Sequence, residues 1–220
     1  AARDGYVDVV LDRSPESLER FFEAHAARDL EPEERVRARQ LLELQRHAML
    51  MTTSCGWFFD ELSGIETVQV IQYAGRAVQL ARDLFEDERI EQAFLERLER
   101  ARSNIPEWKN GRTVYDRAVR PAVVTLQKVA AHYAVSSLFE EYDERTRVYC
   151  YEIERLQEKR LETGRARFAT GRAHVVSTIT GRSREVSYAV LHTGDHNLIG
   201  GVRDYRGDAS YDEMVAELEH

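Results

Sequence analysis

The spacing of apolar residues changes near residue 145, and this change limits the folds open to the chain. Before it, apolar residues recur every three or four positions, as in amphipathic helices. After it, apolar and polar residues alternate, as at Ala173–Ile179 and Val186–His192, which predicts half-buried strands. We therefore expect an α+β fold. A helical bundle would span residues 1–145, an antiparallel β-sheet 146–207, and a short helix with a tag remnant 208–220.

Two positions carry clear helix-start signals. Ser14-Pro15 combines a capping hydroxyl with a proline at the first helical position. Pro32 is followed by Glu33 and Glu34, and acids in a first turn are favoured by the helix dipole. We expect one helix to begin at each site.

Three more helices are expected further along. The segment 65–83 is apolar almost all round, which predicts a helix at the centre of the bundle. Helices are also expected over 87–103 and 113–142, and Pro121 should kink or split the latter. The charged segment 155–165 fits either a helix or a long strand.

Charge and cysteine content narrow the function classes. The 39 acidic and 31 basic residues give a net charge of −8, without the basic excess that binding to duplex nucleic acid needs. No apolar run is long enough to span a membrane. Cys55 and Cys150 fit neither a disulfide framework nor a metal site, so we expect a reducing cytoplasm. The start at Ala1 and the final Leu218-Glu219-His220 suggest a piece of a longer protein.

The densest candidate site is the segment Thr52–Glu61. Three consecutive aromatic residues stand beside two acids, a mixture that suits sugar binding. Aromatic faces stack on pyranose rings, and carboxylates accept protons from hydroxyl groups. Trp57, Phe58, Asp60 and Glu61 are the candidate ligand contacts. The alternative is a structural loop, with its aromatic rings in the core and Asp60 capping the next helix.

A polar stripe on the predicted central helix is a second candidate. It consists of Gln69, Gln72, Arg76, Gln79 and Asp83. Amides at three of these five positions suggest a wet, neutral groove, with Gln72 and Arg76 as ligand contacts. Hydrogen bonding between helices explains the same residues equally well.

Two other clusters are weaker. Cys55 as a nucleophile would need a positioned histidine, and His47 is the nearest upstream. His192, Asp195 and His196 lie within five residues and would suit a metal-dependent hydrolase. A turn held by polar side chains explains the latter group better, so we expect no metal and no cofactor.

Three stretches carry a family resemblance: Leu44–Val70, Arg120–Val123 and His192–Leu198. Together they resemble the C-terminal, functionally uncharacterised domain of some proteins of glycoside hydrolase family 57. The resemblance spans nearly the whole chain, and Ser54–Gly64 is its most specific part. Gly56 stands where some amylase-like relatives carry an acid.

The resemblance implies an accessory role. In that family an N-terminal β/α barrel supplies the catalytic glutamate and aspartate, and a helical region packs on it and adds aromatic residues to the cleft. We therefore expect an accessory domain that lines an α-glucan or oligosaccharide site and is not catalytic alone. Its partner would be the catalytic barrel of the same parent protein. The alternative is a purely structural docking domain with no ligand contacts.

Overall fold

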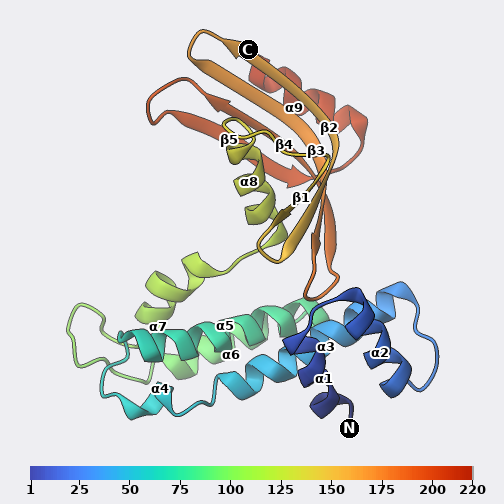
Figure 1. Ribbon diagram of the computed structural model, residues 1–220. Helices are drawn as coiled ribbons and strands as arrows, with labels where there is room; N and C mark the ends of the chain where they lie inside the picture. Colours follow the sequence, from blue (N-terminus) through green and yellow to red (C-terminus); the bar gives the residue numbers. More distant parts are fainter. Residues whose placement is uncertain (220) are drawn as a thin grey trace. The chain divides into compact units, whose positions relative to one another are not determined.

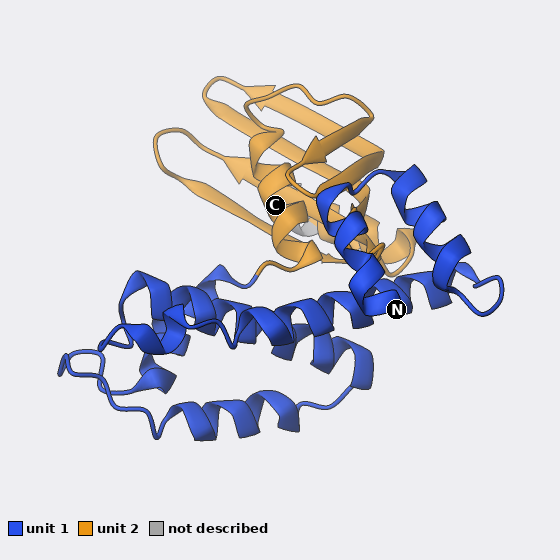
Figure 2. Cartoon of the chain, turned by 60° about the horizontal axis from the view of Figure 1, so that its bottom comes forward, with its two compact units in different colours: residues 1–123 blue, residues 124–220 orange. Residues whose placement is uncertain are grey.

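The computed structural model describes residues 1–219 and has the α+β fold that the two periodicities predict. The chain forms two compact units, a helical one over Ala1–Val123 and one that begins at Val124 and contains the sheet (Figures 1 and 2). His220, the last residue of the expected tag remnant, lies outside the described residues. Among the helices of the described chain, none has the length and apolar character needed to cross a bilayer.

The first unit consists of helices joined by loops. They are α1 (Ala2–Leu11), α2 (Pro15–His25), α3 (Pro32–Leu50), α4 (Cys55–Phe58), α5 (Ile65–Phe85), α6 (Arg89–Leu98) and α7 (Gly111–Val114), then a π-helical turn η1 (Tyr115–Val119) and a 3-10 turn η2 (Arg120–Ala122). α1 precedes the first start signal in the sequence, and α4 is a single turn inside the segment expected as a loop.

Both predicted helix starts are confirmed. The Ser14 hydroxyl accepts a hydrogen bond from the backbone N–H of Ser17 at 3.2 Å, and Pro15 is the first residue of α2. α3 begins at Pro32, and the Glu34 carboxylate accepts a hydrogen bond from the backbone N–H of Glu31 at 3.0 Å. This bond satisfies one of the donors that the first turn leaves unpaired.

The predicted central helix, α5, contacts α3, α4, α6 and η1. It buries Ile71, Leu80 and Leu84 along its length. Ile71 joins Val114 and Tyr115 in one hydrophobic core, which α6 completes. The apolar surface of α5 therefore organises this part of the first unit, as the sequence of 65–83 predicts.

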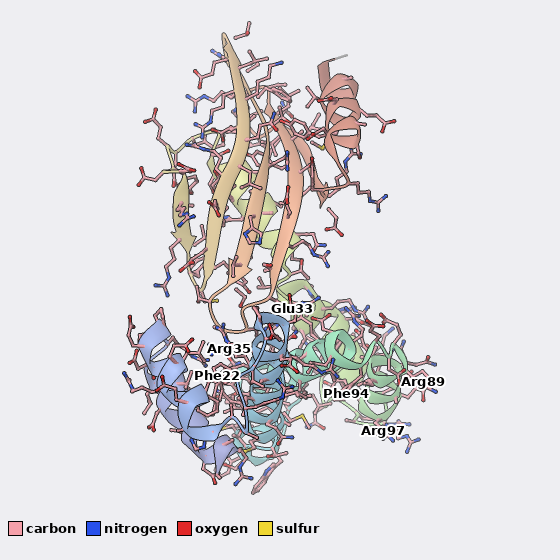
Figure 3. All side chains as sticks on the ribbon, turned by 90° about the vertical axis from the view of Figure 1, so that its right-hand side faces the viewer. Phe22, Glu33, Arg35, Arg89, Phe94 and Arg97 are labelled. Atoms are coloured by element: carbon pink, nitrogen blue, oxygen red, sulfur yellow. The ribbon has the colours of Figure 1, made fainter. Side chains whose placement is uncertain are left out.

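A second core joins α1, α2 and α3. Tyr6, Val9, Phe21 and Phe22 are its buried members. The Arg35 guanidinium of α3 lies over the Phe22 ring of α2, 5.1 Å from the ring centroid (Figure 3). The guanidinium of Arg35 therefore covers the face of a buried aromatic ring where α2 meets α3.

Pro121 splits the helix predicted over 113–142, as expected. After η2 the backbone becomes extended at Val123, because proline lacks an N–H and its ring clashes with the preceding turn. Helix α8 (Leu126–Ser136) then begins behind Thr125, whose hydroxyl accepts a hydrogen bond from the backbone N–H of Lys128 at 3.2 Å. Because α8 packs on the sheet, the units divide at Val123, earlier than the boundary expected near residue 145.

The sheet is an antiparallel meander with strand order β1-β2-β3-β4-β5. Its strands are β1 (Arg145–Val148), β2 (Tyr151–Thr163), β3 (Ala166–Ser177), β4 (Ser183–His192) and β5 (Leu198–Asp204). The ambiguous charged segment 155–165 is thus mostly strand. Gly181, with φ of +75°, occupies the predicted hairpin turn between β3 and β4.

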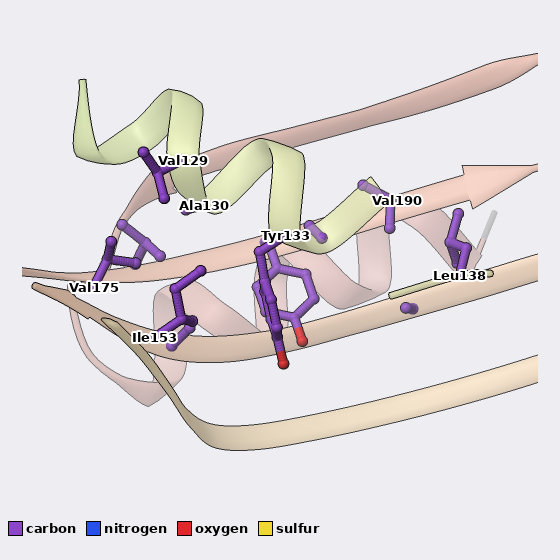
Figure 4. Close-up of a cluster of buried hydrophobic side chains, with 12 residues drawn as sticks. Val129, Ala130, Tyr133, Leu138, Ile153, Val175 and Val190 are labelled. Carbon is purple, nitrogen blue, oxygen red and sulfur yellow. The ribbon is translucent and has the colours of Figure 1, made fainter. Parts of the chain in front are cut away.

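Helices cover both faces of the sheet. On one face, Val129, Ala130 and Tyr133 of α8 pack on Ile153 and Val175 (Figure 4). On the other, Tyr211 and Met214 of α9 (Asp208–Glu219) pack on Phe168 and Ala189. Successive side chains of a strand point to opposite faces, so β3 and β4 contribute alternate residues to the core beneath α8 and to the core beneath α9.

Candidate functional site

The aromatic segment of the first unit lies on the surface. Trp57 and Phe58 are each 74% exposed, and Phe59 is 47% exposed. The Phe58 and Phe59 rings meet edge to face, with centroids 5.2 Å apart. The alternative in which Trp57 and Phe58 anchor the loop in the core is therefore not what the structure has. We call Trp57–Glu61 the aromatic loop.

Packing of α4 against α5 holds the aromatic loop in place. A side chain at Gly56 would put its Cβ 2.8 Å from Cγ1 of Val70, so only glycine allows this close approach. In this chain an acidic side chain there would collide with α5.

The Glu61 carboxylate ties the aromatic loop to a distant loop. It accepts hydrogen bonds from the Ser103 hydroxyl at 2.6 Å, the Asn104 backbone N–H at 2.8 Å, and the backbone N–H and hydroxyl of Ser63, both at 2.9 Å. The Ser103 hydroxyl and the Ser63 backbone N–H are the main causes that lower the pKa of Glu61 to about 2. Glu61 is thus an ionised group that braces the aromatic loop against the loop at Ser103 and Asn104.

Asp60 is exposed, and its carboxylate is not used as a helix cap. α5 begins behind Gly64, which has no side-chain cap. The Asp60 backbone carbonyl accepts a hydrogen bond from the Asn104 side-chain amide. The backbone is therefore held at Asp60, while its side chain is exposed to solvent.

Gln72 and Arg76 lie on a different side of α5 from the aromatic loop. Gly56 faces Val70, and a helix turns about 100° per residue, so the directions of Gln72 and Arg76 differ from that of Val70 by about 160° and about 120° around the helix axis. Arg76 donates a hydrogen bond to the Gln79 side chain at 2.6 Å. The structure therefore brings Trp57, Phe58, Asp60 and Glu61 together and leaves Gln72 and Arg76 apart from them.

Sequence reasoning missed Ser103 and Asn104. Ser103 follows Glu61 by 42 positions, and no local pattern links the two. The Ser103 hydroxyl also accepts a hydrogen bond from the backbone N–H of Ile105 at 3.0 Å, which closes a tight turn. A polar turn of this kind in the sequence indicates a loop but does not identify its partner.

The two weaker clusters are held by other contacts. His47 Nδ1 lies 2.9 Å from the Glu43 carbonyl oxygen, and burial lowers the pKa of its imidazole, while Cys55 is exposed. His192 Nε2 lies 3.2 Å from the Asp195 carbonyl oxygen, and its ring packs on Phe139. Within the described residues, no three His, Cys, Asp or Glu side chains are grouped as metal ligands.

Comparison with known proteins gives one match. A family model described as "Domain of unknown function (DUF3536)" matches residues 1–220. Neither the curated proteins nor the solved structures include a match. The matched range covers the aromatic loop and the sheet alike.

Proposed function

This chain belongs to the DUF3536 family, and we propose that it is an accessory domain of a polysaccharide-processing protein of the glycoside hydrolase family 57 type. In this proposal it packs on a catalytic barrel of the same parent protein and lends its aromatic loop to an α-glucan or oligosaccharide cleft. Bond cleavage belongs to the barrel, and this chain supplies binding surface only.

The exposure of Trp57 and Phe58 on a braced loop carries the proposal. Burying an aromatic side chain contributes roughly 1.5–3 kcal/mol to the free energy of folding. Two rings left in water do not make that contribution. Adjacent exposed rings mark a surface that meets a ligand or a partner. The Glu61 brace fixes the backbone beneath them, which lowers the entropy lost on binding.

Each side chain of the aromatic loop has a distinct role in the proposal. Trp57 stacks on the apolar face of a sugar ring, and Phe58 extends the stacking surface. The exposed Asp60 carboxylate accepts hydrogen bonds from sugar hydroxyls. Glu61, whose oxygens already accept four hydrogen bonds, acts by positioning the loop rather than by meeting the sugar.

The cysteines support a cytoplasmic location. Cys55 and Cys150 are both free, and Cys55 is exposed. An exposed thiol persists where glutathione and thioredoxin keep thiols reduced.

Fluorescence titration tests the sugar-binding part of the proposal. Maltoheptaose is added to about 10 mM, a range that detects a Kd near 1 mM. Trp108 packs in the first unit's core beneath Arg117, so a Trp108→Phe variant leaves Trp57 as the reporter. We expect a saturable change in Trp57 emission. Cellohexaose serves as the linkage control.

Variants of the aromatic loop sharpen this test. Trp57→Ala should abolish binding measured by calorimetry, whereas Phe85→Ala, which removes another exposed aromatic ring at the end of α5, should leave it unchanged. A Trp57 signal that stays flat throughout the titration would remove the sugar-binding role.

The apolar surroundings of the aromatic loop favour one alternative, a purely structural docking domain. Met51 and Ile65 flank the loop and are 39% and 80% exposed. A docking surface without ligand contacts predicts self-association of the isolated chain, reversed by Trp57→Ala and Ile65→Ser, with no response to maltoheptaose. Sedimentation measurements on the same samples separate the two functions.

A further inference from the structure

A hollow opens on the sheet of the second unit. Its volume is about 560 Å³, inside the range of roughly 300–1,000 Å³ typical of small-molecule sites. Eight residues of β1, β2 and β3 line it: Arg145, Thr146, Arg147, Glu152, Ile153, Glu154, His174 and Val176. We call it the sheet hollow. It shares no residue with the aromatic loop.

Strand register explains how the sheet hollow forms. Arg145 of β1 is opposite Glu154 of β2, which is opposite His174 of β3. Two residues further along β1, Arg147 is opposite Glu152. Residues two apart on a strand share a face, so these side chains all project from the same face. Ile153 lies between Glu152 and Glu154 on β2, and its side chain points to the opposite face of the sheet, into the core beneath α8.

Helix α9 covers only part of that face. It packs on β3 at Phe168, and its Asp208 pairs with Arg172 at 3.2 Å. His174 and Val176 continue the same face of β3 and line the sheet hollow instead. The hollow is therefore an uncovered stretch of the face on which α9 lies.

The wall of the sheet hollow offers both hydrogen-bond donors and acceptors. Arg145 donates to Glu154 Oε1 at 2.9 Å, which leaves the second oxygen of that carboxylate available. Arg147 uses its Nε–H on the Tyr149 carbonyl, at 3.1 Å, and keeps its terminal N–H groups. Within the described chain, no hydrogen bond engages the side chains of Glu152 or His174.

The charges in the wall select the class of ligand. Two guanidinium groups, Arg145 and Arg147, stand among two carboxylates, Glu152 and Glu154, so the wall is close to neutral. An anion would meet both carboxylates, and a cation would meet both guanidinium groups. A hydroxyl group donates and accepts at once, and so it can use neighbouring groups of both kinds.

We infer that the sheet hollow is a binding site for a neutral, hydroxyl-rich ligand such as a short oligosaccharide. One ligand hydroxyl group would accept a hydrogen bond from Arg147 and donate one to Glu152. A second would use His174 and the free oxygen of Glu154 in the same way. Val176 provides an apolar floor for the C–H face of the ligand. This site goes beyond the proposed function, because it lies in the other unit and does not use the aromatic loop.

NMR of the full chain, labelled with 15N, tests the inference. Maltotriose is the probe, with inorganic phosphate and glycylglycine as anionic and zwitterionic comparisons. We expect saturable shifts from maltotriose at the amides of 145–147 and 152–154 and at the His174 ring. We expect none there from the other two compounds.

Variants locate the site. Arg147→Ala and His174→Ala should each weaken maltotriose binding about tenfold or more, because each removes a hydrogen-bonding group of the wall. The isosteric Glu152→Gln, which preserves packing, should weaken it less. Arg206→Ala is the matched control, since Arg206 is exposed and lies outside the hollow. Trp57→Ala should leave these shifts unchanged.

The outcomes separate this inference from the proposed function. Shifts confined to the aromatic loop overturn the sheet hollow and leave the proposed function standing. Shifts confined to the hollow support the inference and remove the role of Trp57. A response to phosphate or glycylglycine without one to maltotriose overturns the ligand class, and no response to any of the three overturns the site.

Discussion

The buried carboxylate of Glu43 in α3 is a sharp test of how the first unit is stabilised. Its side chain is 2% exposed. It accepts a hydrogen bond from the Tyr6 hydroxyl at 2.8 Å and pairs with Arg13 at 2.7 Å and with Arg46 at 3.3 Å. These contacts join α1, the α1–α2 loop and α3 through a single acid.

Glu43→Gln keeps the shape and removes the charge. Losing one partner of a buried ion pair costs roughly 3–5 kcal/mol, because the remaining charge is left uncompensated. Arg13 and Arg46 are 25% and 37% exposed, so water relieves part of that cost. We therefore expect Glu43→Gln to lower the free energy of unfolding by about 3 kcal/mol. That is a large share of the roughly 5–15 kcal/mol by which a typical domain is stable.

The measurement is urea unfolding followed by circular dichroism, with hydrogen exchange at α3 amides to isolate the first unit. Tyr6→Phe removes one hydrogen bond to a charged group and should cost about 1.5–3 kcal/mol. The double variant should cost less than the sum, because both changes act on the same cluster. Glu23→Gln, on the exposed side of α2, should change stability by less than about 0.5 kcal/mol. A Glu43→Gln cost no larger than that control would refute the reasoning.

Glu43 also predicts a pH dependence. Burial alone would raise the pKa of its carboxyl, but the Tyr6 hydrogen bond and the Arg13 charge outweigh burial, so the pKa lies below its ordinary value of 4.5. A lowered folded-state pKa contributes stability above the unfolded value and loses it as the pH falls through the folded value. The difference in unfolding free energy between wild type and Glu43→Gln should therefore have its full value at neutral pH and decrease below pH 4.5. A gap that widens on acidification would contradict this sign.

Three further changes test other parts of the molecule. Leu80→Ala, at a side chain 1% exposed in α5, should cost about 2–5 kcal/mol in urea unfolding. Gly171→Ala would put a Cβ 2.5 Å from the Tyr188 hydroxyl oxygen, and calorimetry should show a loss of about 1–3 kcal/mol; an unchanged melting temperature would contradict this contact. Glu61→Gln should speed hydrogen exchange at Asn104, whereas the wild-type brace should persist on acidification until the pH nears its pKa of about 2.

The secondary structure follows largely from local sequence signals. Ser14, Pro15 and Pro32 mark helix starts, and Pro121 marks a break, because each acts on the backbone within one helical turn. Alternation identifies β3 and β4 for the same reason. The sequence of segment 155–165 is ambiguous because its charges suit an exposed helix as well as the exposed end of β2.

The candidate site is only partly local. The composition of Trp57–Asp60 indicates a ligand or partner surface, yet the same residues suit a buried loop. Exposure depends on where α4 docks, and the contact of Gly56 with Val70 sets that position. Gln72 and Arg76 share the polar stripe that the sequence predicts, but helix rotation carries them away from the loop.

The spacing of apolar residues, the capping residues and the prolines specify the helices and strands and their order along the chain. These signals act locally, between residues a few positions apart. The pairing of Glu61 with Ser103, the charge cluster at Glu43 and the rows of side chains around His174 join distant segments. Such contacts exist only once the elements have packed, since packing sets which polar groups lose water and must find a partner.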